Sequence, residues 1–126
     1  MLVQGPPGAG KSDLVLRLLN RGFDLVADDQ VVIVGNRASP PATLAGLLEV
    51  RGLGIVRLPW MADVPLALAI ELGELADRLP MPKTHPDLGI PLSRLDASSM
   101  SAVDRVILAL DCALGSVTQV AGAFAP

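Results

Sequence analysis

Residues Gly5–Ser12 match the phosphate-binding loop pattern G-x-x-x-x-G-K-[ST] at every fixed position. Three glycines in this stretch permit backbone conformations that residues with a Cβ atom avoid, so consecutive N–H groups can point at one anion. The apolar pair Leu2-Val3 precedes the loop, and leucines at helical spacing follow it in Asp13–Asn20, before a C-capping Gly22. The stretch therefore predicts a strand, a loop and a helix that together bind the phosphates of a nucleoside triphosphate.

Each part of this loop has a predicted role. Lys11 supplies a mobile positive charge for the terminal phosphates, Ser12 offers a hydroxyl group to Mg²⁺, and the helix turns its positive end toward the same phosphates. The alternative is a glycine-rich turn that only joins a strand to a helix. Since glycine makes up only about 7% of residues on average, a chance match of all fixed positions is rare. The predicted phosphate-binding residues are Gly5, Pro6, Pro7, Gly8, Ala9, Gly10, Lys11 and Ser12.

The size and composition of the chain exclude other classes of protein. Its 126 residues are enough for one compact domain with a single core and too few for two ordinary domains. Two Phe, one Trp and no Tyr leave an aliphatic core and little surface on which bases could stack. A net charge of −3 without a basic run gives no electrostatic reason for DNA or RNA binding. We therefore expect no nucleic-acid partner.

The sequence also carries no signal for secretion or membrane insertion. No N-terminal segment combines basic residues, an apolar stretch and a cleavage site. The longest apolar run, Val64–Ile70, contains Pro65 and is far shorter than the ~20 residues that a helix needs to cross a bilayer. The expectation is a cytoplasmic protein with no membrane partner.

Two adjacent carboxylates, Asp28 and Asp29, follow the apolar segment Phe23–Ala27, which we expect to form a short strand. In phosphate-loop proteins an acidic residue at a strand end commonly reaches the metal ion or its bound water. Successive strand residues point to opposite faces, so one carboxylate is expected to face the nucleotide and the other to face away. A polar strand end without a catalytic role is the alternative interpretation. The position directly after the helix of the loop favours the catalytic one.

The rest of the chain predicts more strands and a C-terminal helix. His85 is interpreted as a solvated loop residue, and Cys112 as a small buried side chain. Ser101 and Asp104 resemble a capping box at the start of a helix over Ser101–Ala113. Strands are expected at Val31–Val34, which leads into a Gly35-Asn36 turn, at Glu49–Val56, which its glycines bend, at Val64–Leu72 and at Ile90–Leu95.

With these pieces in order, the chain resembles the catalytic domain of HPr kinase/phosphorylase, the bacterial enzyme that phosphorylates a serine of the phosphocarrier protein HPr. Three segments carry the resemblance: the loop Gly5–Ser12, the acidic pair in Leu25–Asp29, and Leu48–Ile55, whose letters L-E-V-R-G-L-G-I look like the family's signature. The last segment is the most specific, because phosphate-binding loops occur in many families. The resemblance covers most of the chain. In its compact form the chain is most similar to the short alphaproteobacterial members of the family.

The resemblance implies an α/β fold related to phosphoenolpyruvate carboxykinase: one phosphate-loop-containing domain over residues 1–126, with a mixed sheet and a C-terminal helix. It implies ATP and Mg²⁺ as cofactors and HPr as the protein partner, in regulation of the phosphotransferase system, and it suggests a homo-oligomer. Ser12 and Glu49 would hold Mg²⁺, and Lys11 would stabilise the transferring phosphoryl group. Asp29 would accept the proton of the substrate serine, supported by Asp28. Phosphoryl transfer depends mainly on such positioning and charge neutralisation.

Two departures from the family pattern bear on this role. Family members have strands and a histidine before the loop, whereas here only Met1–Gln4 precedes it, so we expect upstream strands to be missing. Longer members have a basic loop before the C-terminal helix that serves catalysis, whereas Leu95–Ser99 contains no basic residue. The reverse phosphorolysis reaction would have to proceed without that loop. Two alternatives to an HPr kinase remain open: a small-molecule kinase, and a nucleotide-binding regulatory module without activity.

Overall fold

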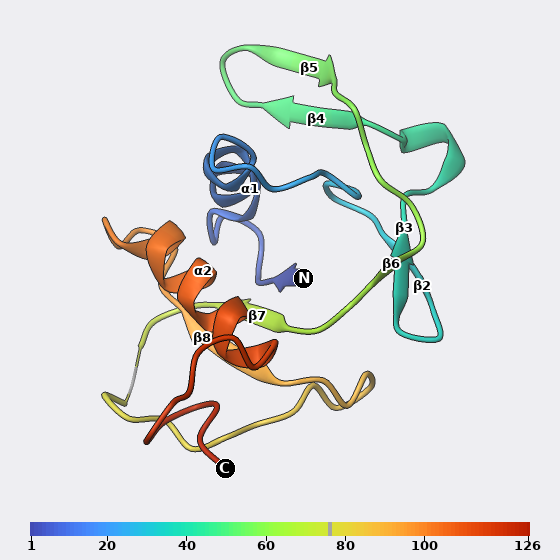
Figure 1. The fold of residues 1–126 in the computed structure, drawn as a ribbon. Helices are drawn as coiled ribbons and strands as arrows, with labels where there is room; N and C mark the ends of the chain where they lie inside the picture. Colours follow the sequence, from blue (N-terminus) through green and yellow to red (C-terminus); the bar gives the residue numbers. More distant parts are fainter. Residues whose placement is uncertain (76) are drawn as a thin grey trace. The chain divides into compact units, whose positions relative to one another are not determined.

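The computed structural model of the chain describes residues 1–75 and 77–126. These residues form two compact units, one made of Met1–Lys11 with Leu66–Pro126 and the other of Ser12–Pro65. Figure 1 shows short strands together with the helices α1 (Lys11–Leu19) and α2 (Ala102–Ala113). The chain is therefore a small mixed α/β protein, as expected. In the described residues, however, parallel and antiparallel pairings lie in separate sheets, so the prediction of one mixed sheet is wrong.

The first unit is built on a parallel sheet in which a buried central strand lies between two others, with helix α2 packed on β8 (Figure 1). Val3 lies opposite Ile70, and Ile70 lies opposite Ser93. The side chains of Leu68, Ile70 and Val106 are at most 1% exposed, which confirms the aliphatic core that the composition predicts. The three strands, in spatial order, are β1 (Leu2–Gln4), β7 (Ala69–Leu72) and β8 (Leu92–Leu95).

The second unit contains two antiparallel sheets and most of helix α1, whose buried face carries Leu14 and Leu18. The turn predicted at Gly35-Asn36 is confirmed: both residues have positive φ, 56° and 59°, as tight hairpin turns require. One sheet has the order β2 (Val32–Val34), β3 (Arg37–Ser39) and β6 (Val64–Pro65), and the other pairs β4 (Leu47–Val50) with β5 (Gly54–Arg57). The short helix η1 (Ala42–Leu44) lies between β3 and β4 in sequence.

Three predicted strands differ in the structure. The segment Glu49–Val56 is not one bent strand but a hairpin, because Gly52 adopts a φ of 82° and the N–H of Leu53 donates to the Val50 carbonyl at 2.9 Å. The run Val64–Leu72 divides into β6 and β7, which belong to different sheets. Proline lacks the N–H group that a continuing strand would use, so Pro65 is a natural place for this division. Within the described residues, the segment Phe23–Ala27 forms no regular strand and contributes one isolated bridge, from Leu25 to Trp60.

Helix α2 starts where the sequence predicts, but without the expected capping box. The Ser101 side chain makes no capping hydrogen bond, and its Oγ accepts a hydrogen bond from Nε of Arg105 at 2.8 Å instead. Before the helix, Asp96 accepts hydrogen bonds from the hydroxyl and the backbone N–H of Ser98, at 2.6 and 2.9 Å. These bonds, with a smaller contribution from the charge of Arg105, lower the pKa of the Asp96 carboxyl.

The glycine before β4 provides a stability test. Gly46 has a φ of 76°, and a Cβ atom added there would lie 2.5 Å from the Leu58 carbonyl oxygen. Gly52 has a similar φ of 82°, but an added Cβ would meet nothing within 4 Å. Both alanine substitutions carry the cost of about 1–2 kcal/mol for a left-handed residue. Only Gly46→Ala adds a backbone clash, so it should lower the free energy of unfolding by at least about 1 kcal/mol more than Gly52→Ala.

Urea denaturation of the two variants measures this difference directly. Equal destabilisation would contradict the close approach of Gly46 to Leu58.

Candidate functional site

The loop that follows β1 has the backbone geometry expected for phosphate binding. Gly8 and Gly10 have φ values of 80° and 92°, in the region that residues with a Cβ avoid. The N–H of Ala9 donates to the Pro6 carbonyl at 3.1 Å, which closes a tight turn. Nζ of Lys11 donates to the carbonyl oxygen of Gly5 at 2.9 Å, so the lysine folds back over the loop that it ends. The predicted order of strand, loop and helix is confirmed.

The surroundings of the three glycines show which side of the loop is open. A Cβ atom on Gly5 would lie 3.1 Å from Cβ of Leu72, and one on Gly10 would lie 3.3 Å from Cβ of Ala97. A Cβ on Gly8 would meet nothing within 4 Å. The loop therefore rests on the end of β7 and on the segment after β8, while Gly8 faces open space. A tightly turned glycine loop with an open side and a lysine beside it fits an anionic phosphate chain.

The structure separates the two adjacent aspartates. Oγ of Ser12 donates a hydrogen bond to Oδ1 of Asp28 at 3.1 Å, although 16 residues separate them in sequence. Asp28 is half-buried, whereas Asp29 is exposed. One carboxylate thus contacts the hydroxyl group expected to bind the metal, and the other faces solvent, although no regular strand precedes the pair. A hydroxyl oxygen and a carboxylate oxygen are hard ligands of the kind that Mg²⁺ prefers, with substrate phosphates and water completing its shell.

Glu49, the other predicted metal ligand, lies on β4 opposite Ile55 with its side chain exposed. In residues 1–75 and 77–126, no hydrogen bond joins Glu49 to Ser12 or Asp28. Across the same described part of the chain, no group of three or more His, Cys, Asp or Glu side chains is placed to hold a metal ion. The contact of Ser12 with Asp28 was therefore missed by the sequence analysis, and the pairing of Ser12 with Glu49 stays a prediction.

The interpretation of His85 as a solvated residue is wrong. Its side chain is only 8% exposed, and its Nδ1 atom accepts hydrogen bonds from the backbone N–H groups of Asp87 and Leu88, both at 3.2 Å. The backbone of His85 also bonds to Ile90 and Gly89. The ring thus holds together the turn that leads into β8. The turn-forming residues Asp87 and Gly89 were the signal in the sequence. Cys112 carries a free thiol and is half-buried rather than fully buried.

The described helices are all too short or too polar to cross a lipid bilayer.

Comparison with known proteins identifies relatives of this chain. Residues 1–61 match the family described as HPr Serine kinase C-terminal domain. The proteins named HPr kinase/phosphorylase from Burkholderia cenocepacia and Paraburkholderia phymatum are 32% identical to this chain over an alignment 141 residues long, which covers 97% of this chain. The chain spans 43% of the length of these relatives.

A solved structure is similar in fold. The Hpr(Ser) kinase/phosphatase from Coxiella burnetii superposes with a TM-score of 0.67 over 90% of this chain and 82% of that chain, at 24% sequence identity. This similarity shows a shared fold. Together with the sequence matches, it confirms the resemblance found in the sequence: nearly the whole chain is similar to proteins named HPr kinase/phosphorylase.

Proposed function

We propose that this chain is the phosphoryl-transfer part of an ATP-dependent protein-serine kinase that acts on HPr. The observation that carries the proposal is the hydrogen bond from Ser12 to Asp28, directly after a glycine loop that ends in Lys11. This bond joins Ser12, the predicted metal ligand, to Asp28, one of the two aspartates predicted to take part in phosphoryl transfer. The names of the relatives supply the protein substrate.

The binding of ATP and Mg²⁺ is part of the proposal. The phosphates would lie against Gly5–Ser12, and Ser12 and Glu49 would hold the ion, with Asp28 beside Ser12. The open side of the loop at Gly8 and the hard oxygen atoms of Ser12 and Asp28 support this fit. When bound, ATP supplies the phosphoryl group and Mg²⁺ neutralises part of its charge.

The side chains of this chain would then divide the remaining work. Lys11 would leave the Gly5 carbonyl and place its charge on the phosphoryl oxygens, where negative charge is spread during transfer. Asp29 would accept the proton of the substrate serine, and its exposure supports access by a protein substrate. Asp28 would orient the Ser12 hydroxyl through the bond that it already accepts.

The wider assignment is also a proposal. We assign the fold to the phosphate-loop class related to phosphoenolpyruvate carboxykinase, with residues 1–126 as a catalytic domain. We place the protein in the cytoplasm, as a homo-oligomer that regulates the phosphotransferase system. The matches to HPr kinase/phosphorylase proteins support these assignments, and the similar fold of the Coxiella burnetii protein supports the fold class alone.

The formation of ADP from ATP, with and without purified HPr, tests the proposed function. An HPr kinase should form ADP in proportion to the HPr supplied. Rapid ADP formation with a small molecule and none with HPr would indicate a small-molecule kinase. Saturable ATP binding without turnover would indicate a regulatory module.

The proposed metal role of Glu49 predicts a specific defect. Glu49→Gln should raise the Mg²⁺ concentration needed for half-maximal transfer by about tenfold or more, because an anionic oxygen ligand is replaced by a neutral amide. Nucleotide binding measured without metal should not change. Glu74→Gln, which removes an exposed carboxylate in the other unit, is the matched control. A Mg²⁺ titration that is the same for Glu49→Gln and the control would show that Glu49 does not bind the ion.

A further inference from the structure

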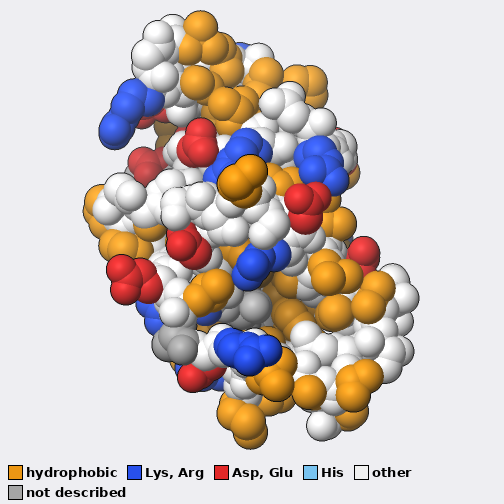
Figure 2. Space-filling model, turned by 90° about the vertical axis from the view of Figure 1, so that its left-hand side faces the viewer, with side chains coloured by type: hydrophobic (Ala, Val, Ile, Leu, Met, Phe, Trp, Pro, Cys, Tyr) orange, Lys and Arg blue, Asp and Glu red, His pale blue; other side chains and the backbone are white. Residues whose placement is uncertain are grey.

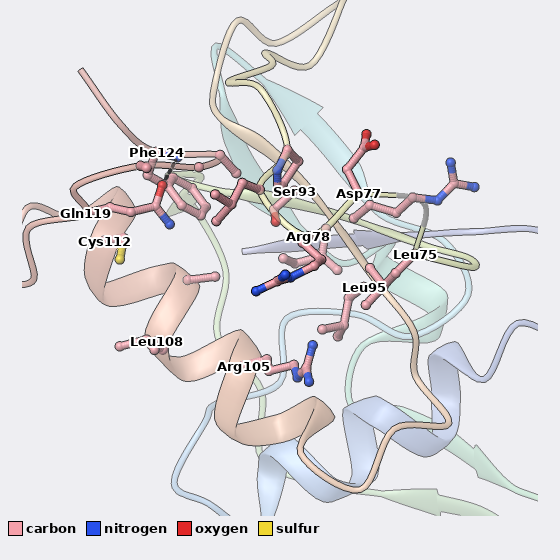
Figure 3. A pocket seen from close by; sticks show the side chains of 18 of the residues that line it. Leu75, Asp77, Arg78, Ser93, Leu95, Arg105, Leu108, Cys112, Gln119 and Phe124 are labelled. Carbon is pink, nitrogen blue, oxygen red and sulfur yellow. Dashed lines mark hydrogen bonds between the residues drawn. The ribbon is translucent and has the colours of Figure 1, made fainter.

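A cavity of about 400 Å³ lies within the unit formed by Met1–Lys11 and Leu66–Pro126, between β8, helix α2 and the C-terminal segment (Figure 3). Its volume lies within the range of about 300–1,000 Å³ that is typical of small-molecule sites. In the lower part of Figure 2, hydrophobic side chains surround a hollow that has basic side chains beside it. Much of the wall is apolar and consists of Ile70, Leu95, Leu108, Ala109, Ala123 and Phe124.

Three arginines also line this cavity: Arg78, Arg94 and Arg105. Figure 3 shows the side chains of Arg78 and Arg105 projecting into the space between α2 and the strand that carries Ser93 and Leu95. Among the described lining residues, Asp77 is the only one with a carboxylate, and Figure 3 shows it directed away from these two arginines. The cavity therefore combines an apolar wall with positive charge.

The arginines are not neutralised by strong ion pairs within the described chain. Arg78 has no hydrogen bond or ion pair to any other described residue. Arg94 is 4.0 Å from Glu71 with both side chains about half exposed, at 53% and 48%, so solvent screens the pair. Arg105 uses Nε to bond Ser101 at 2.8 Å, which anchors the side chain and leaves the terminal nitrogens as donors.

The C-terminal wall of the cavity is held in place by Gln119. Its Oε1 atom accepts a hydrogen bond from the N–H of Phe124 at 2.6 Å, which is the dashed line in Figure 3. A Cβ atom added to Gly122 would lie 3.0 Å from the same Oε1, so the turn packs tightly around the amide. The oxygen of Gln119 is thus engaged, and its NH₂ group remains a potential donor at the cavity. The wall is built before any ligand arrives.

We propose that this cavity binds a small organic anion that has an apolar body and one carboxylate or phosphate group. The apolar wall would cover the body, and Arg78 and Arg105 would bind the anionic group, because a guanidinium presents paired N–H donors to carboxylate or phosphate oxygens. Ser93 and the NH₂ group of Gln119 would add neutral hydrogen bonds. A neutral ligand would gain no charged hydrogen bond from the arginines, and an inorganic anion would leave the apolar wall uncovered. The site is separate in sequence from the phosphate loop.

Isothermal titration calorimetry tests the ligand class, with the Lys11→Ala variant used to weaken anion binding at the phosphate loop. The probes are 3-phenylpropionate, phenyl phosphate, neutral 3-phenylpropan-1-ol and inorganic phosphate. At least one of the two aromatic anions should bind with a Kd of about 1 mM or below, and the alcohol and inorganic phosphate should not saturate. The tighter aromatic anion identifies the anionic group. Equal binding of the alcohol, or no saturable binding of either aromatic anion, would overturn the proposal.

Two further substitutions in the same background locate the site. Arg78→Gln should weaken binding of the aromatic anion by about tenfold, because a charged hydrogen bond is lost, while Arg57→Gln on β5 should have no effect. Ala109→Leu keeps a good helix former in α2 but fills the apolar part of the cavity, so it should abolish binding. Circular dichroism checks that the variants are folded. Unchanged affinity in both Arg78→Gln and Ala109→Leu would show that the anion binds elsewhere.

Discussion

Replacing Lys11 with alanine is expected to lower the rate of phosphoryl transfer by about a thousandfold, because the transferring group loses the cation that offsets its charge. ATP affinity should fall by about tenfold, since charge-assisted hydrogen bonds to the phosphates are lost. The loop should keep its conformation, which depends on Gly8 and Gly10, although the bond from Lys11 to Gly5 disappears. Calorimetric ATP binding and a transfer assay separate the two effects.

The chain offers a matched control for this substitution. Lys83 is the other lysine of the sequence, and it is exposed in the loop before β8. Lys83→Ala should leave both ATP binding and transfer unchanged. If Lys11→Ala bound ATP and transferred phosphate as well as this control, the assignment of Gly5–Ser12 as a phosphate-binding loop would be wrong.

The second large effect is expected at the aspartate pair. Asp29→Asn should reduce the phosphorylation rate by about a hundredfold or more, as loss of a general base does, while ATP and HPr binding stay nearly intact. Asp28→Asn should be milder and should act through Mg²⁺, because an amide can still accept the Ser12 hydrogen bond but carries no charge for the ion. Initial rates for both variants, at several Mg²⁺ concentrations, distinguish the two roles.

The assignment of the base can be reversed by the same experiment. Wild-type rates for Asp29→Asn, together with an inactive Asp28→Asn, would make Asp28 the base. The half-buried position of Asp28 and its contact with Ser12 would then describe a base held next to the metal ligand.

Local sequence patterns predicted those parts of the fold in which neighbouring residues determine the backbone. The glycine loop after β1, the Gly35-Asn36 turn and helix α2 depend on glycine conformations or on helical spacing, and the predicted conformation of all three is confirmed. Strand pairing depends on distant residues. The segment Glu49–Val56 resembles one bent strand in sequence, and only the pairing of β4 with β5 shows that the chain reverses at Gly52.

Only the part of the candidate site that depends on neighbouring residues could be predicted from the sequence. The phosphate-loop pattern contains Lys11 and Ser12, but the bond between Ser12 and Asp28 spans 16 residues and follows from how the chain turns after α1. The cavity could be predicted even less, because Arg78, Arg94 and Arg105 follow no sequence pattern. They line one cavity only when β8, α2 and the segment that carries Arg78 come together.

Transfer of label from γ-³²P-ATP to purified HPr tests the central claim most directly. Wild-type protein should place label on HPr serine in a Mg²⁺-dependent reaction, HPr with that serine changed to alanine should take up none, and the Lys11→Ala protein should be inactive. Saturable ATP binding without any labelled HPr, or equal labelling of the alanine form of HPr, would contradict the proposal that this chain transfers phosphate to a serine of HPr.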